Sequence, residues 1–256
     1  MRITTWNVNG LRSAVRKGFL RHLDESRPDV LLLQEVRAKP EQLPEEIRHP
    51  EGWQVVWNPA ERPGYSGTAV WSRFPIDDVT LGMGRRLPDD EGRLLTAVIR
   101  GIRLSCVYLP SGSSSVARQA VKDQWLKKFQ RWAGTLVAGG PFLLGGDLNI
   151  AHTESDIFYA RANENTSGFL PHERAWFGQL LQSGWHDLVR EHFGSVPGPY
   201  SWWSNRGRAR ELDRGWRIDY LLSNAAARPM VTNAAIHREA GLEISDHAPV
   251  TVDLQL

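Results

Sequence analysis

The stretch FLLGGDLNIAH, residues 142–152, ends an apolar run with two glycines, a carboxylate and an amide. Residues 142–144 predict a short buried strand, because a brief apolar run bounded by glycine is typical of strands covered on both faces. Asp147 and Asn149 follow two residues apart, and this spacing puts side chains on one face of an extended chain. We therefore expect both polar groups to point into one cleft at the strand end, with the glycines letting neighbouring backbone pack close.

Similar strand patterns recur along the whole chain, whereas helical patterns occupy only regions near residues 18–27, 115–133 and 172–182. The other strand-like runs are RITTWNV (2–8), DVLLLQE (29–35), WQVVW (53–57), GTAVWS (67–72), LLTAVIR (94–100), IRLSCVYL (102–109), YSWWS (200–204), RIDYLLS (217–223) and PVTVDLQL (249–256). So many strands exceed what a doubly wound sheet needs. They predict an α/β fold of two packed sheets with helices outside, in a single domain over residues 1–256.

The composition is that of a globular domain with 256 residues, 41% of them hydrophobic. The one cysteine, Cys106, excludes an intramolecular disulfide, which suits a reducing cytoplasm. The N-terminus enters a strand pattern directly, and neither a signal peptide nor an apolar run of membrane length is recognisable. We expect a soluble cytoplasmic protein with no membrane partner.

The charge balance does not by itself indicate a polyanionic partner, because 31 basic and 29 acidic residues leave a net charge of +2. Only five of the basic residues are lysine. Arginine suits bidentate contacts with phosphate, although a GC-rich genome would produce the same bias. The 11 tryptophans exceed the usual share, and some of them are candidates for stacking surfaces.

Polar side chains stand where several predicted strands end. Taken singly, an Asp or Asn there is an ordinary turn former. Glu35 within LLLQEV and Asp219 between Ile218 and Tyr220 are different, since a buried carboxylate needs a partner. The whole set is Asn7, Asn9, Glu35, Tyr108, Asp147, Asn149, Asp219, Asp246 and His247. It offers oxygen ligands for a hard divalent cation, an Asp–His pair and a base for water, which favours metal-assisted phosphoester hydrolysis.

Nine motifs along the chain carry a family resemblance: WNVNGLR, LQE, GYSG, EGR, YLPSG, GDLNIAH, SGFLPHER, GWRIDYLL and SDHAPV. In order and spacing they resemble the exonuclease III family of apurinic/apyrimidinic (AP) endonucleases, within the endonuclease/exonuclease/phosphatase superfamily. The resemblance implies a DNase I-like fold, a four-layer α/β sandwich with its site at one edge of two sheets. It also implies cleavage of DNA 5′ to an abasic site in base excision repair with Mg²⁺ or Mn²⁺, and some 3′-phosphodiesterase or 3′–5′ exonuclease activity.

The resemblance assigns roles to the strand-end residues. Glu35 corresponds to a metal ligand, with Asn9 and Asp246 near it as direct or water-mediated ligands. Asp147 corresponds to the residue that orients or deprotonates the attacking water, and Asn149 to the one that holds this water or the phosphate. The full set implied for the metal is Asn7, Asn9, Glu35, Asp147, Asn149, Asp246 and His247, in which Asn7 would fix the carboxylates.

The remaining catalytic roles concern the phosphate. His247 corresponds to the group that hydrogen-bonds the scissile phosphate, and Asp219 would orient it. Tyr108 corresponds to a phenol that contacts the phosphate and assists the leaving oxygen. The resemblance leaves open which of Tyr108 and Asp147 handles which proton.

The DNA-facing residues implied by the resemblance centre on the stretch YSWWSNRGRARELDRGWRIDY, residues 200–220. Trp202, Trp216 and Ile218 would wall a small apolar pocket for a flipped, baseless sugar, and Trp203 is expected in the core. The loop between them carries Arg206, Arg208, Arg210, Arg214 and Arg217. Arg206 would enter the duplex beside the lesion. The positions matching phosphate-contacting or site-supporting residues are Arg12, Tyr65 and Arg93.

Two positions depart from the family pattern. Ser111 follows YLP where Asn or Gln is common, and Thr166 stands where many members carry a second Asn facing DNA. Two rival interpretations remain, another phosphoesterase of the same fold and a catalytically inactive DNA-binding module. The preferred interpretation is a monomer acting on double-stranded DNA with abasic sites, in the cytoplasm near a bacterial nucleoid, with no nucleotide cofactor.

Overall fold

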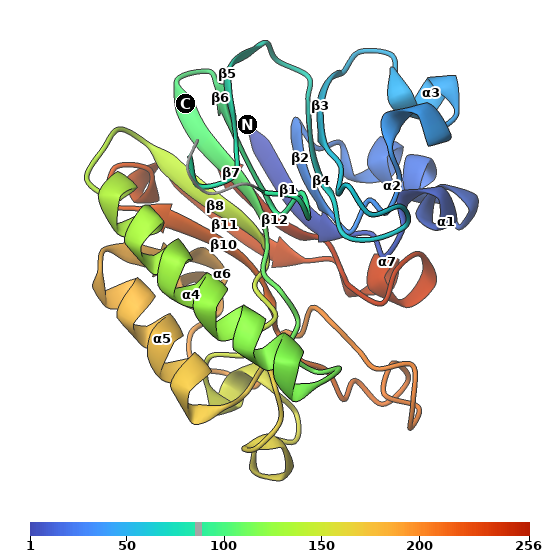
Figure 1. Ribbon diagram of the computed structural model, residues 1–256. Coiled ribbons are helices and arrows are strands. Elements are labelled where there is room, and N and C mark those ends of the chain that lie inside the picture. The colour runs from blue at the N-terminus through green and yellow to red at the C-terminus, as the bar shows by residue number, and fades with distance from the viewer. Residues whose placement is uncertain (85–88) are drawn as a thin grey trace.

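The computed structural model describes residues 1–84 and 89–256, which form two sheets packed face to face (Figure 1). The first sheet has six strands in the order β11-β12-β1-β2-β4-β3. Their bounds are β1 Arg2–Asn7, β2 Val30–Gln34, β3 Gln54–Asn58, β4 Thr68–Ser72, β11 Val231–Ile236 and β12 Val250–Leu254. The central strands β1 and β2 run parallel, and β12 and β4 flank them antiparallel.

The second sheet repeats this plan with six strands in the order β5-β6-β7-β8-β10-β9. The strands are β5 Ile76–Leu81, β6 Leu94–Ile99, β7 Ile102–Tyr108, β8 Phe142–Asp147, β9 Trp185–Asp187 and β10 Asp219–Asn224. Here β7 and β8 form the parallel centre, with β6 and β10 antiparallel on either side. Each sheet therefore has two parallel central strands whose carboxyl ends lie at the same edge.

The glycines of β8 explain how closely the layers approach. A Cβ atom on Gly146 would lie 1.8 Å from the carbonyl oxygen of Val107 on β7. A Cβ atom on Gly145 would lie 2.5 Å from Leu32 Cδ1 on the facing sheet. No larger residue fits at either position without moving its neighbours, which confirms the expectation of close packing drawn from the sequence.

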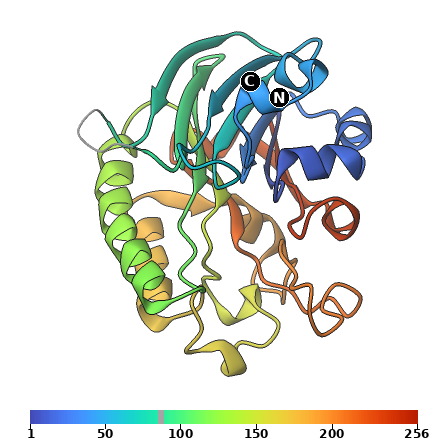
Figure 2. The same ribbon diagram turned by 45° about the vertical axis from the view of Figure 1, so that its right-hand side comes forward.

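Helices cover the outer faces of both sheets and complete four layers (Figures 1 and 2). The long helices α4 Val116–Leu136 and α5 Pro171–Gln182 lie over the second sheet, with Phe129 and Trp176 in the apolar layer beneath them. The other helices are α1 Leu11–Arg16, α2 Phe19–Ser26, α3 Glu45–Arg48, α6 Leu188–Phe193 and α7 Arg238–Glu243, with short 3₁₀ turns η1 Pro40–Gln42, η2 Glu154–Asp156, η3 Arg161–Asn163 and η4 Arg228–Met230. The predicted α/β sandwich is confirmed.

Two differences from the predicted elements have simple causes. YSWWS is not a strand: Trp202 makes only isolated bridges to Trp216 and His247. Its aromatic and alternating pattern reflects a loop that packs on both sides. The strands not predicted are β5, β9 and β11, which are partly exposed edge strands or very short, so their sequences lack an apolar run.

Across residues 1–84 and 89–256, none of the helices combines the length and the apolar character needed to cross a membrane.

Candidate active site

The candidate site lies where the carboxyl ends of the central strands of both sheets meet. In the second sheet, Tyr108 pairs in register with Asp147, and Asp147 pairs in register with Asp219. Three neighbouring strands thus present these side chains in one row. The first sheet contributes Asn7 from the end of β1 and Glu35 from just beyond β2. The long loops over residues 148–170 and 200–218 project from the same edge (Figure 2).

The sequence suggested that the acid–amide pair at the end of β8 would meet through strand spacing. The structure brings the two side chains together in a different way. The strand ends at Asp147, and Asn149 has a left-handed backbone with φ of 51°. The Asn149 backbone N–H donates to Asp147 Oδ1 at 2.8 Å, and its side-chain Nδ2 donates to Asp147 Oδ2 at 3.3 Å. A tight turn capped by the aspartate therefore brings the two side chains together.

The end of β1 repeats this turn. Asn9 has a φ of 46°, and its backbone N–H donates to Asn7 Oδ1 at 3.0 Å. The Asn9 side chain is turned away from Asn7 and donates to Asp246 Oδ1 at 2.7 Å. The two sheets thus end in the same turn, and each turn delivers one amide toward a carboxylate.

Asn7 joins the two sheets. Its fully buried Nδ2 donates to Glu35 Oε1 and to Asp147 Oδ2, both at 2.9 Å. Since its Oδ1 accepts the Asn9 backbone N–H, both ends of this amide are occupied by protein. The geometry agrees with a residue that fixes carboxylates in place.

Tyr108 and Arg37 also bind Glu35. The Tyr108 hydroxyl donates to Glu35 Oε1 at 2.7 Å, and the Arg37 guanidinium pairs with Glu35 Oε2. Burial, followed by the charges of Glu35 and Asp147, raises the pKa of Tyr108 well above its usual value. The phenol is therefore a neutral hydrogen-bond donor. The sequence did not single out Arg37, whose only signal is its place two residues after Glu35.

His247 lies between two aspartates, with its Nδ1 at 2.9 Å from Asp219 Oδ2 and its Nε2 at 3.9 Å from Asp147 Oδ2. Burial opposes a charge on the ring, but Asp219, Asp147 and Asp246 outweigh burial and raise the pKa of His247 to about 10. The ring is therefore an imidazolium with N–H groups on both sides. The expected contact between Asp219 and His247 is present.

The surroundings of Asp147 raise the pKa of its carboxyl group. Burial and then the charge of Asp219 raise its pKa to about 7, against the lowering effects of His247 and of the Asn7 hydrogen bond. The pKa of Asp246 is lowered, because the charge of His247 and hydrogen bonds from Asn9 and Trp202 outweigh its burial. A proton-accepting carboxylate thus lies close to one that stays ionised.

A cavity of about 370 Å³ opens above these groups. Most of the expected site residues line it, together with several that the sequence did not assign. The lining residues are Asn9, Glu35, Arg37, Tyr108, Ser111, Ser113, Asp147, Asn149, Thr166, Ser167, Gly168, Trp202, Trp216, Ile218, Asp246 and His247. Ser111 and Thr166, the two departures from the family pattern, are among them.

The three residues expected to form a pocket wall do lie together in this cavity. The rings of Trp202 and Trp216 meet edge to face with centroids 6.1 Å apart, and Ile218 belongs to the apolar cluster behind them. Trp202 Nε1 donates to Asp246 Oδ2 at 3.2 Å, which ties the wall to the acidic group. Trp203 is fully buried, as expected of a core residue.

Arg217 corrects one expectation about the arginine loop. Its side chain is fully buried and pairs with Asp156 at 2.6 Å and with Asp187 at 2.8 Å, so it does not face outward with the other loop arginines. It lies between Trp216 and Ile218 in the sequence. The buried ion pairs therefore anchor the strand-like segment that carries the pocket wall.

The other residues expected to contact DNA or support the site fall into two groups. Arg12 and Arg206 are exposed and lie outside the cavity. Arg93 is only 2% exposed, and it stacks on the Tyr108 ring and donates to the Tyr108 carbonyl oxygen at 3.0 Å. The Tyr65 hydroxyl accepts from Arg93 at 2.9 Å. Tyr65 and Arg93 thus support the site from beneath.

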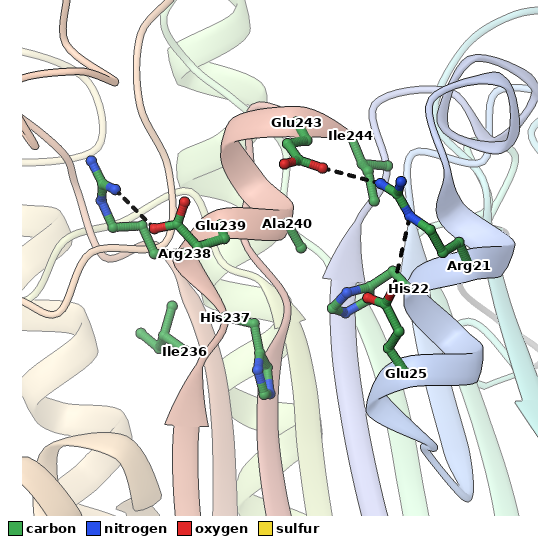
Figure 3. Close-up of a pocket in the computed structure, with 10 residues that line it drawn as sticks. All are labelled: Arg21, His22, Glu25, Ile236, His237, Arg238, Glu239, Ala240, Glu243 and Ile244. Carbon is green, nitrogen blue, oxygen red and sulfur yellow. Dashed lines mark hydrogen bonds and ion pairs between the residues drawn. The ribbon is translucent and has the colours of Figure 1, made fainter.

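A second cavity, of about 600 Å³, lies between α2 and α7, away from these residues (Figure 3). Its arginines are neutralised locally, since Arg21 pairs with Glu25 and Glu243. His22 and His237 also line it, and their ring centroids are 6.0 Å apart. The balanced charges distinguish this cavity from the acidic site.

Comparisons with known proteins agree with this geometry. A model of the Endonuclease/Exonuclease/phosphatase family matches residues 4–247. The chain is 36% identical to an exodeoxyribonuclease of Bacillus subtilis (strain 168) over 257 residues, covering all of both chains. It is also 36% identical to the DNA repair nuclease APEX1 of Danio rerio, over 99% of this chain and 82% of that protein.

Solved structures show the same similarity. A 3′–5′ exonuclease from Neisseria meningitidis has a TM-score of 0.91 at 30% identity, and an AP endonuclease from Archaeoglobus fulgidus has a TM-score of 0.90 at 27% identity. In both comparisons each chain is covered completely. The chain therefore belongs to the endonuclease/exonuclease/phosphatase family.

Proposed function

We propose that this protein is a metal-dependent AP endonuclease, acting as a single domain, that hydrolyses the DNA phosphodiester 5′ to an abasic site in base excision repair. Removal of 3′-blocking groups and 3′-nucleotides is a second activity of the same site. The observation that carries the proposal is one cavity that joins the Asp147–His247 group to the two-indole wall. Full-length similarity to an exodeoxyribonuclease and to AP endonucleases supports it.

Asp147 is the group assigned to the attacking water. Its Oδ2 accepts from Asn7, and its Oδ1 accepts the backbone N–H of Asn149, so the carboxylate cannot rotate. A pKa of about 7 lets it accept a proton at neutral pH and return it afterwards. Asn149 lines the same cavity, and because its Nδ2 donates to the Leu109 carbonyl oxygen and to Asp147, we assign its Oδ1 to the attacking water.

His247 and Tyr108 are the groups assigned to the phosphate. The His247 imidazolium brings a positive N–H donor to oxygens that grow negative as the phosphorus becomes pentacovalent. The neutral Tyr108 hydroxyl donates its one proton to Glu35, and we assign this donor to the leaving oxygen once it turns from Glu35 to the phosphate. With its Nδ1 held by Asp219, His247 has Nε2 left, and we assign this nitrogen to the phosphate.

The residues fit a divalent cation. Four acids converge here, and Glu35, Asp246 and Asn9 bring carboxylate and amide oxygens to the lining of one cavity. Asp147, Asp219 and His247 place ligand atoms within 4.8 Å of one another, but the Asp219–His247 hydrogen bond occupies that group. We therefore assign the cation to Glu35, Asp246 and Asn9, with Asp147 and Asn149 beside them.

Enzymes of this family use a metal ion, and an all-oxygen donor set favours Mg²⁺ or Mn²⁺. When bound, the cation would offset negative charge on the phosphate. The carboxylates of this chain would hold it, and Asn7 fixes two of them, Glu35 and Asp147, through its hydrogen bonds.

Double-stranded DNA with an abasic site is the proposed substrate. The baseless sugar has already lost its stacking and pairing, so extruding it costs less than extruding an intact nucleotide. Trp202, Trp216 and Ile218 form a wall that suits this sugar. The exposed Arg206 and Arg12 are assigned to the duplex and its phosphates, and the chain is proposed to act as a monomer.

The test is cleavage of a duplex that contains one tetrahydrofuran abasic analogue, with Mg²⁺ and then with EDTA. We expect a single cut 5′ to the analogue, abolished by EDTA, and no internal cut in the matched intact duplex. Binding without cleavage would support an inactive DNA-binding module. Release of phosphate from phosphoinositides without DNA cleavage would support another phosphoesterase of the same fold.

A further inference from the structure

Lys122 on α4 and Glu173 on the first turn of α5 form an ion pair 2.6 Å long in which both side chains are fully buried. The two helices lie side by side over the second sheet (Figure 1). A buried ion pair contributes little net stability relative to an apolar pair of similar volume, because desolvating two charges is costly. Lys122 and Glu173 each make further hydrogen bonds besides their ion pair, and these bonds indicate a different role for the two residues.

Lys122 reaches the turn that holds the acid–amide pair. Its Nζ donates to the backbone carbonyl oxygen of Asn149 at 2.9 Å. Asn149 keeps a left-handed backbone, which is unfavourable for a residue with a side chain. Its Nδ2 also donates to the Leu109 carbonyl oxygen at 2.9 Å. The ammonium group thus fixes the peptide that follows Asn149, and with it the direction of the amide toward Asp147.

Glu173 holds the opposite wall of the cavity. Its Oε2 accepts the backbone N–H groups of Gly168 at 2.7 Å and of Leu170 at 3.1 Å. Gly168 lines the cavity, and a Cβ atom there would lie 3.3 Å from Trp216 Cζ3. The Gly168 carbonyl oxygen accepts from the backbone N–H of Ala151 at 2.8 Å, two residues beyond Asn149.

Gln119 extends this wall support. Its Nε2 donates to Glu173 Oε1 at 3.0 Å, and its Oε1 accepts the hydroxyl of Ser167 at 2.6 Å. Ser167 lines the cavity beside Gly168. The segment over residues 167–170 is therefore attached to the two helices by side-chain contacts that all meet at Glu173.

We propose that Lys122 and Glu173 are positioning residues that couple the catalytic Asn149 to the wall of the sugar pocket. Lys122 sets the Asn149 amide beside Asp147, Glu173 sets the segment over residues 167–170 against Trp216, and the ion pair fixes one relative to the other. Neither touches DNA. The coupling is inferred from the contacts alone. Its effect on catalysis rests on the proposed function.

The decisive variant is the double substitution Lys122→Met/Glu173→Gln. It removes both buried charges together, and the glutamine oxygen still accepts from Gly168 and Leu170, so the melting temperature should stay within a few degrees of the parent. With the Asn149 peptide released, kcat on the abasic duplex should fall by about 10- to 100-fold, as misplacement of a reacting group does. KM should change by less than about twofold, because the wall is retained.

Two further variants act as controls. Lys127→Met removes one charge from the exposed side of α4 and should leave kcat and KM unchanged. Lys122→Arg keeps the charge and donor groups, so it should retain more of kcat than Lys122→Met. If Lys122→Arg and Lys122→Met lose kcat equally, the donor to Asn149 is not what matters.

A double-mutant cycle with Asn149→Ala separates positioning from a general effect on the fold. If Lys122 acts through the Asn149 amide, the paired substitution should change kcat by less than about threefold once that amide is absent. A loss by the same factor in both backgrounds would overturn the proposal. No loss in the parent background would overturn it equally.

Amide hydrogen exchange tests the coupling without reference to activity. In Lys122→Met/Glu173→Ala the amides of Gly168 and Leu170 lose their acceptor and should exchange faster than in the parent, whereas amides in the centre of β8 should not. Faster exchange in a protein that does not cleave abasic duplexes would reject the proposed function and keep the coupling. Unchanged exchange would reject the coupling.

Discussion

Replacing Asp219 by asparagine tests how the site keeps His247 charged. The aspartate accepts from His247 Nδ1 at 2.9 Å, and its charge is the main reason why the pKa of the ring rises from 6.5 to about 10 despite complete burial. Asp219→Asn keeps the shape but removes the charge, so the pKa of the ring falls, because burial is then opposed mainly by the charges of Asp147 and Asp246. Losing one charged donor to a phosphate in the transition state should cost about 10²- to 10³-fold in kcat.

The same substitution should reshape the pH dependence of cleavage. In the parent, His247 stays charged from pH 6 to 9, and activity should rise through pH 7 as Asp147 ionises. In Asp219→Asn the ring holds a proton only on the acidic side. The pKa of Asp147 also falls, because the charge of Asp219 helps to raise it. The ratio of mutant to parent kcat should therefore fall steadily between pH 6 and pH 9.

The assay is single-turnover cleavage of a labelled abasic duplex at saturating Mg²⁺ across that pH range. Ser201→Ala removes a hydroxyl that donates to Asp219 at 2.7 Å and accepts the backbone N–H groups of Ile218 and Asp219, but it keeps the Asp219 charge, so this matched control should keep the parental pH profile. In a cycle with His247→Gln, the double mutant should be little slower than the slower single mutant. A mutant-to-parent ratio that is constant with pH, or fully additive losses in the cycle, would refute the reasoning.

Four further outcomes are expected. Glu35→Gln should keep the fold but need more Mg²⁺, so cleavage recovers partly at high metal concentration; an unchanged metal titration would contradict its assignment as a ligand. Trp216→Ala should lower abasic cleavage while removal of normal 3′-nucleotides holds or rises, and an equal fall in both activities would show that the indole supports the fold or the metal site. Gly146→Ala forces a Cβ atom to within 1.8 Å of a carbonyl oxygen and should cost about 2–3 kcal/mol or more in urea unfolding, whereas a loss below about 0.5 kcal/mol would contradict the packing. Burial, with the nearby His237 and Arg21, lowers the pKa of His22 to about 4 from 6.5 in the unfolded chain. Because the folded form resists protonation of this ring, the stability of the protein should be complete above pH 6.5 and should decline as the pH falls toward 4. His22→Phe should flatten the melting temperature over this range, and an equally steep decline in the variant would exclude His22 as the cause.

The sequence predicted the central strands and the long helices well because their local signals agree with their environment. Residues 142–144 are apolar and lie in a strand buried on both faces, and α5 Pro171–Gln182 coincides with the helical pattern near residues 172–182. Edge strands were harder to predict. β5 is exposed along most of its length, so its residues carry no apolar periodicity. YSWWS carried the pattern of a strand but makes only isolated bridges, since Trp203 packs in the core whereas Trp202 lines the cavity.

Chemistry could be predicted from the residue types at the strand ends, but their arrangement could not. Asp147 and Asn149 meet, though through a turn with a left-handed residue that no spacing argument contains. Arg217 follows Trp216 in an arginine-rich loop, yet buried aspartates from two other segments hold it inside. Lys122 had no recognisable signal, because it acquires its role from Glu173, a partner brought near by folding, and the only signal of Arg37 was its place two residues after Glu35.

The sequence by itself determined the two packed sheets with helices outside, the buried glycines of β8 and the acids, amides and imidazole available for catalysis. These are local properties, set by apolar periodicity, backbone sterics and side-chain chemistry. Only the tertiary structure decided that the ends of two sheets meet, that Asn7 holds Glu35 and Asp147 together, and that His247 is charged. Those properties depend on distances between residues far apart in the sequence, such as Asn7 and Asp147, which are 140 positions apart, and on the exclusion of water around them. Burial and neighbouring charge, which arise only on folding, give the same side chains their proton affinities.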